Sequence, residues 1–167
     1  IVVPFLTPML ENAGAIVFSA RERARQPRDI IIDNDASGND RGLYIEEKQR
    51  KTHWEDGALG FAIPHDALRH GDNPFREGTS RILRTANHEK HSQGAALWIP
   101  HIPERGHYAV YATYQSYPSS VPDAEYLVMH AGGTTRIKVN QQMGGGTWVY
   151  LGTYEFLGGQ RDDQMVI

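Results

Sequence analysis

The chain has 167 residues, no cysteine, 17 Lys and Arg against 20 Asp and Glu, and a formal net charge of −3. This length suits one domain with a sizeable core, and the lack of cysteine excludes disulfides, thiolate zinc sites and a cysteine nucleophile. The slightly acidic balance gives no electrostatic reason to expect nucleic-acid binding. No apolar run approaches the roughly 20 residues that span a bilayer.

Residues 1–28 differ in character from the rest. Residues 4–14 place apolar side chains on one face of a short helix that ends at Gly14, and residues 15–18 form a short apolar strand. A helix followed by a strand is typical of a fragment of an α/β domain. The chain opens without Met and stops in an apolar run, so we expect both ends to continue in a longer protein.

From residue 29 onward the pattern is mainly β. Residues 30–32 predict a strand, and the polar stretch 42–94 predicts a long, loop-rich excursion with one or two short strands. Further short strands, separated by turn residues, are predicted at 95–100, 107–114, 124–130, 134–140, 147–156 and 164–167. This spacing predicts an antiparallel, jelly-roll-like β-sandwich over residues 29–167.

Two details of the predicted strands bear on the faces of the sandwich. In the strand 107–114, Tyr108, Val110, Ala112 and Tyr114 face one way, while Tyr111 faces the other. In the last long strand, Gly152 predicts a bulge or bend.

Aromatic residues are concentrated in the β part of the chain. Alternate aromatics on strands usually fill a core, and we interpret Trp98 and Trp148 in this way. Rings near loops can instead stack on the apolar C–H face of a sugar, and arginines in the excursion can provide a local basic patch. The candidate ligand-binding residues are Trp54, Tyr114, Tyr117, Arg76 and Arg81.

The histidines match no zinc-binding signature. His88 and His91 are three positions apart, and His65 and His70 are five apart, neither of which is the spacing of H-E-x-x-H. We therefore expect no zinc site within this chain. Neither a G-x-S-x-G elbow nor a phosphate-binding loop is present, so no catalytic centre is expected either.

Residues 33–38 resemble the front of an EF-hand loop. Position 12 of such a loop holds Tyr44 here instead of the bidentate Glu, so an EF-hand is not expected. The carboxylates of Asp33, Asp35 and Asp40 remain a candidate structural Ca²⁺ site. The alternative is that they end a strand and cap a turn.

The runs DAEYLVMHAGGTT (123–135), VNQ (139–141) and GGTWVYLGTYEF (145–156) resemble the golvesin/xanthan-lyase carbohydrate-binding-like domain. The pattern of that family is approximately DA-Y-V-HAGG-T, then VNQ, then GG-WV-LG-Y-F, with dashes for free positions. The resemblance covers about residues 30–167. It implies a β-sandwich appended to secreted or cell-envelope bacterial enzymes that act on polysaccharide or cell wall, and a motif that is mostly structural.

Residues 8–22 carry a second resemblance, to the helix–strand of zinc-dependent N-acetylmuramoyl-L-alanine amidases. None of that family's zinc-ligand His and Glu residues is matched here. The resemblance implies that the zinc and the catalytic residues belong to a parent enzyme outside this chain.

Three hypotheses stay open at this point. The first is a non-catalytic module that recognises a polysaccharide or peptidoglycan glycan for the parent enzyme. The second is a part of a zinc-dependent amidase in which the sandwich shapes the cleft. The third is a structural spacer or docking domain, which predicts that every matched Trp and Tyr is buried.

Overall fold

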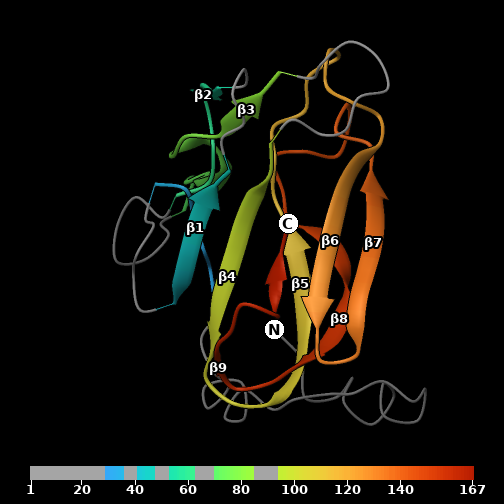
Figure 1. Ribbon diagram of the computed structural model, residues 1–167. Coiled ribbons are helices and arrows are strands. Elements are labelled where there is room, and N and C mark those ends of the chain that lie inside the picture. Colours follow the sequence, from blue (N-terminus) through green and yellow to red (C-terminus); the bar gives the residue numbers. More distant parts are fainter. Residues whose placement is uncertain (1–28, 36–40, 48–52, 63–69, 85–93) are drawn as a thin grey trace, which may run out of the picture.

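The computed structural model describes residues 29–35, 41–47, 53–62, 70–84 and 94–167, and almost all of its regular structure is β (Figure 1). A 3₁₀ helix spans Pro74–Arg76. The strands are β1 (Gly42–Glu46), β2 (Trp54–Asp56), β3 (Arg81–Leu83), β4 (Ala96–Ile102), β5 (Gly106–Ala112), β6 (Ala124–His130), β7 (Gly133–Val139), β8 (Val149–Phe156), β9 (Gly159–Gln160) and β10 (Met165–Val166).

The strands form one large sheet and two small ones, and all their pairings are antiparallel. The large sheet has the order β1-β4-β10-β6-β7, with β9 paired to the end of β4. Within the described residues, β5 pairs with β8, and β2 pairs with β3 as a small separate ribbon near the end of β1 (Figure 1).

The core lies between the large sheet and the β5–β8 pair. One cluster joins Ile102 of β4, Val128 of β6 and Phe156 of β8. A second cluster joins Tyr126 of β6, Val139 of β7 and Leu151 of β8. Burial of each such side chain stabilises the fold by about 1.5–3 kcal/mol, so the two layers hold together as the predicted β-sandwich.

Most of the predicted strands are confirmed. The strand 124–130 coincides with β6, and the strands predicted at 95–100, 107–114, 134–140, 147–156 and 164–167 overlap β4, β5, β7, β8 and β10. The prediction for residues 30–32 is wrong, because they lie outside the named strands. Ile30 instead packs its side chain against the core cluster of Ile102.

The stretch 42–94 also differs from the prediction. It contributes three short strands, β1, β2 and β3, and the 3₁₀ helix. β1 is hydrogen-bonded along its length to β4, so this stretch begins inside the large sheet instead of as an excursion from it. Residues 1–28 lie outside the described residues, and their predicted helix–strand remains a prediction.

No helix in the described part of the chain has the length and apolar character to cross a membrane.

Candidate functional site

The outward face of the β5–β8 pair carries a regular ladder of side chains. Tyr108 and Val110 of β5 pack toward the core, so the alternation of the strand turns His107, Ala109 and Tyr111 outward. Their cross-strand partners on β8 are Glu155, Thr153 and Tyr150, respectively.

A β-bulge at Gly152 sets which β8 residues share this face. Val110 pairs with Gly152 and Tyr111 pairs with Tyr150, so Leu151 is the extra residue. Gly152 has φ +136°, and a Cβ at this position would collide with the Tyr154 ring. Only glycine fits there, and as a result Tyr150 and Thr153 both point outward while Leu151 enters the core.

The two outward tyrosines form an exposed aromatic pair. The ring centroids of Tyr111 and Tyr150 are 5.3 Å apart at an interplanar angle of 50°. Tyr111 is 50% exposed and Tyr150 is 56% exposed. The Tyr150 hydroxyl lies 2.7 Å from Thr153 Oγ1, which fixes the ring across the bulge. The pair presents apolar ring surface to solvent on the outward face of the β5–β8 pair, an arrangement suited to stacking.

The other end of the ladder is polar. Arg105 Nε donates to Glu155 Oε1 at 2.7 Å, and His107 lies directly opposite Glu155 in the strand register. The hydrogen bond from Arg105 lowers the pKa of the Glu155 carboxyl, and the charges of Arg105 and His107 act in the same direction. The face therefore runs from an aromatic end to an ion pair.

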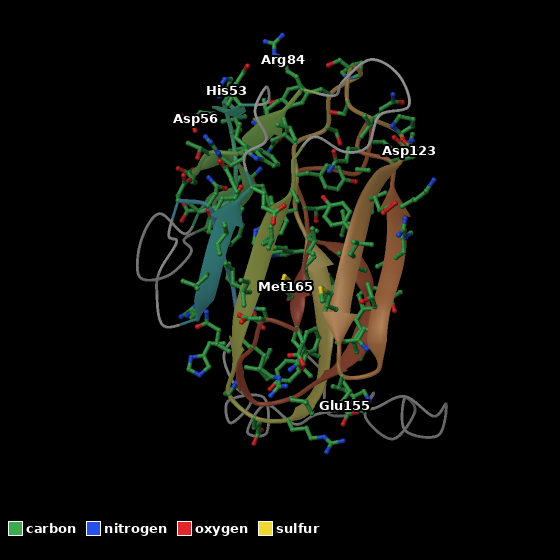
Figure 2. All side chains as sticks on the ribbon, in the orientation of Figure 1. His53, Asp56, Arg84, Asp123, Glu155 and Met165 are labelled. Atoms are coloured by element: carbon green, nitrogen blue, oxygen red, sulfur yellow. The ribbon has the colours of Figure 1, made fainter. Side chains whose placement is uncertain are left out.

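A second group of aromatic side chains connects loops at one end of the sandwich. This is the end where Asp123 is labelled in Figure 2, opposite the end that carries Glu155. Trp148 packs on Phe61 and Phe75, with ring centroids 4.8 Å and 5.8 Å away. Gln115 Nε2 donates to the Phe75 carbonyl at 3.0 Å, which ties the β5–β6 loop to the 3₁₀ helix. Trp148 is 40% exposed, so its predicted place in the core is wrong.

Three of the sequence-predicted ligand residues belong to these loops. The Tyr114 hydroxyl donates to the Met143 carbonyl at 2.9 Å, and burial raises its pKa. Tyr117 is exposed on the β5–β6 loop, and Arg76 is exposed on the 3₁₀ helix. The loops are tightly interlocked, since a Cβ on Gly145 would lie within 2.7 Å of backbone and side-chain atoms of Tyr114 and Ser116.

The other two predicted ligand residues lie on the β2–β3 ribbon. Trp54 is half-buried, and its Nε1 donates to the Glu47 carbonyl at 3.4 Å. Arg81 donates to Glu46 of β1 and to Asp56 of β2, which fastens the ribbon to the edge of the large sheet. The hydrogen bond that Arg81 donates to the Glu46 carboxylate raises the pKa of Arg81. Arg81 thus has a structural role. Ligand binding by Trp54 or by Arg81 stays a prediction.

The candidate Ca²⁺ carboxylates are engaged in a turn. Asp33 Oδ1 accepts from the Asp35 backbone N–H at 2.9 Å, and burial raises the pKa of Asp33. Asp35 accepts from the backbone N–H and the hydroxyl of Thr79. Asp40 lies outside the described residues. Among the residues that the structure describes, no group of three or more His, Asp or Glu side chains is placed to hold a metal ion.

The HAGG part of the family motif has a structural role. His130 Nδ1 accepts from the Gly132 backbone N–H at 3.2 Å, so Nε2 carries the proton and lies 3.0 Å from Thr135 Oγ1. The imidazole stacks on Tyr154 with centroids 4.7 Å apart. His130 therefore holds the β6–β7 turn and the end of the core together.

Tyr111 and Tyr150 are not among the candidate ligand-binding residues predicted from the sequence. The alternation of the strand 107–114 already separated Tyr111 from the inward residues, so that signal was present. Tyr150 becomes outward because of the bulge at Gly152, which the sequence predicted without assigning faces to the strand.

The fold and the exposed tyrosine pair define a class: a β-sandwich domain with an exposed aromatic pair on its smaller sheet. The model of the Golvesin C-terminal domain matches residues 74–166, more than half of the chain. The chain therefore belongs to the Golvesin C-terminal domain family.

Two xanthan lyases are similar to this chain. The xanthan lyase of Bacillus sp. (strain GL1) is 43% identical over 65 residues, which are 39% of this chain and 7% of that protein. A solved structure of Paenibacillus xanthan lyase aligns with a TM-score of 0.48 and 23% identity, over 78% of this chain and 12% of that one. The chain thus spans a small part of the length of either relative.

Proposed function

We propose that this domain is a non-catalytic glycan-recognition module of a larger bacterial enzyme that acts on polysaccharide or peptidoglycan. The observation that carries the proposal is the pair Tyr111 and Tyr150, both at least half exposed on the outward face of the β5–β8 pair. An exposed apolar patch rimmed by polar groups is typical of an interaction site.

The chemistry of the pair suits a sugar. A pyranose ring has an apolar C–H face that packs on an aromatic ring, while its hydroxyls need polar partners at the ring edges. Tyrosine supplies contact area with few rotatable bonds, so little side-chain entropy is lost on binding. The phenol hydroxyl of Tyr150 and the hydroxyl of Thr153 lie beside the rings as polar groups.

The context of the relatives supports the same proposal. Both relatives are named as xanthan lyases, and this chain corresponds to a small part of each. Within this proposal the remainder of the parent enzyme supplies catalysis, and the protein is secreted or resides in the periplasm or cell envelope.

The spacer hypothesis is less well supported. It predicts that every matched Trp and Tyr is buried, whereas Trp148, a matched residue, is 40% exposed. The amidase hypothesis rests on residues 8–22, outside the described residues. This hypothesis is tested by deleting residues 30–167 from the full-length parent and measuring zinc-dependent amide hydrolysis. An unchanged rate would show that the sandwich has no role in that reaction.

The proposal is tested by glycan-array and pull-down assays with the 167-residue chain, using peptidoglycan and neutral and acidic polysaccharides. We expect millimolar or tighter binding to at least one glycan, and loss of that binding in Tyr111→Ala and Tyr150→Ala. Tyr117→Ala is the matched control, because it removes an exposed tyrosine from a loop.

Two outcomes contradict the proposal. Absence of binding to every glycan counts against the function itself. Loss of binding in Tyr117→Ala, with Tyr111→Ala and Tyr150→Ala unchanged, moves the site to the loops. Thermal unfolding of each variant checks that it is folded, since removal of a cross-strand pair costs roughly 0.2–1 kcal/mol.

A further inference from the structure

We infer that the glycan site is elongated and selects a neutral sugar chain, which lies along β5 from the tyrosine pair to the Arg105–Glu155 ion pair. This inference rests on the proposed function and specifies its ligand. Three features support the inference: the length of the residue ladder on the outward face, the small side chains at its middle, and the charges at its polar end.

The ladder has the length for more than one sugar. Tyr111 and His107 are four residues apart on β5, and a strand rises about 3.3 Å per residue, so about 13 Å separates the two rungs. This exceeds the length of one pyranose ring. The rung between them pairs Ala109 with Thr153, two small side chains. The side chains between the two ends therefore protrude little, and a sugar chain that lies on the tyrosines can continue over them.

The polar end offers both hydrogen-bond donors and acceptors. The side chains of Arg105 and Glu155 are 68% and 34% exposed, so both remain accessible while paired. The backbone carbonyl of Glu155 accepts from the Ala131 N–H at 2.9 Å, which fixes the strand at this point. A guanidinium can donate to a sugar hydroxyl, and the adjacent carboxylate can accept from the next hydroxyl.

The charge at this end favours a neutral ligand. The ion pair is internally neutral, because the Arg105 charge is already matched by Glu155. A carboxylated sugar placed here would find the Arg105 guanidinium already paired, and it would have the Glu155 carboxylate beside it. The net charge of −3 of the whole chain acts in the same direction. Hydroxyls arranged around the ring edge satisfy both groups without bringing a second carboxylate beside Glu155.

The test is isothermal titration of the chain with cello-oligosaccharides from glucose to the tetrasaccharide, and with the corresponding glucuronate oligomers of the same backbone. We expect affinity to rise with chain length for the neutral series and to be weaker for the acidic series. Arg105→Met should lower affinity for the tetrasaccharide about two- to tenfold, the effect of one hydrogen bond. It should leave the affinity for glucose unchanged.

The matched control is Arg161→Met, which breaks a different exposed ion pair, the one with Asp163. Equal effects of the two variants, equal affinity for glucose and tetrasaccharide, or tighter binding of the glucuronate series would each overturn the inference. If any of these occurs while binding still depends on Tyr111, the proposed function stands and only the inference fails. Absence of binding to both series in the titration, with binding to another glycan on the array, also overturns only the inference.

Discussion

Replacement of Gly152 by alanine tests how the fold builds the outward face. Gly152 has φ +136°, a conformation that residues with a Cβ rarely adopt. The added methyl group would also overlap the ring of Tyr154, whose hydroxyl donates to the Leu151 carbonyl at 2.8 Å. Two features therefore disfavour any residue other than glycine at the bulge: the backbone conformation and the packed Tyr154 ring.

The expected cost follows from these two terms. A backbone conformation accessible mainly to glycine costs about 1–3 kcal/mol for another residue, and overpacking of a core typically costs a further 1–3 kcal/mol. We expect Gly152→Ala to lower the free energy of unfolding by about 2–6 kcal/mol. Native domains are stable by only about 5–15 kcal/mol, so this is a large fraction of the total.

Urea unfolding followed by tryptophan fluorescence measures this change. Gly158→Ala is the matched control, because an added Cβ there meets no atom closer than 3.7 Å and the backbone is not in the left-handed region. The control should lie within about 0.5 kcal/mol of the wild type. If Gly152→Ala unfolds at the same urea concentration as Gly158→Ala, the bulge does not require glycine and the account of the outward face is wrong.

Three further predictions concern polar groups. Arg81→Met removes the guanidinium that pairs with the partly buried Glu46 carboxylate of β1 and should cost roughly 1.5–3 kcal/mol in urea unfolding, whereas an unchanged midpoint would contradict the fastening role. Gln164→Met removes the acceptor of the Leu157 backbone N–H from a residue that is 2% exposed, and should cost about 1–3 kcal/mol by the same assay. Arg105→Met should raise the pKa of Glu155 toward its usual value in an NMR titration, and an unchanged pKa would exclude the ion pair in solution. Because folding lowers this pKa in the wild type, the pair's stabilisation is present above the unfolded-state pKa and is lost as the pH falls through the folded-state value.

The strands that the sequence predicted well are those with a strict alternation between faces. In β6, Tyr126 and Val128 point into the core, and a shift of one residue would turn both of them away from it. Because the energy of such a strand depends on its own side chains, its position can be read from the sequence alone.

The wrong predictions concern strands whose existence depends on distant partners. Residues 30–32 have a strong β-forming composition but no assigned strand, whereas Gly42–Glu46 lies in a polar stretch and pairs along its whole length with β4. Strand formation requires a partner for the backbone hydrogen bonds, and local composition does not identify that partner.

The candidate site was harder to predict because one bulge changes which side chains share a face. Without an extra residue, Tyr150 would lie on the same face as Gly152, Tyr154 and Phe156 and would be counted as core. With the bulge, Tyr154 and Phe156 remain inward and Tyr150 turns out beside Tyr111. The sequence predicted the bulge, but its consequence depends on the register between β5 and β8.

This geometry also explains why family membership identifies the fold more directly than the ligand. In the pattern GG-WV-LG-Y-F, the fixed letters after the tryptophan include Leu151, Tyr154 and Phe156, which contribute to the core, and the glycine that forms the bulge. The free positions after the tryptophan are those of Tyr150, Thr153 and Glu155, the β8 residues of the outward face. A domain can satisfy the whole pattern with any side chains at these positions. The ligand of this domain must therefore be determined from its own outward residues, and the titrations with variants of Tyr111 and Arg105 address them directly.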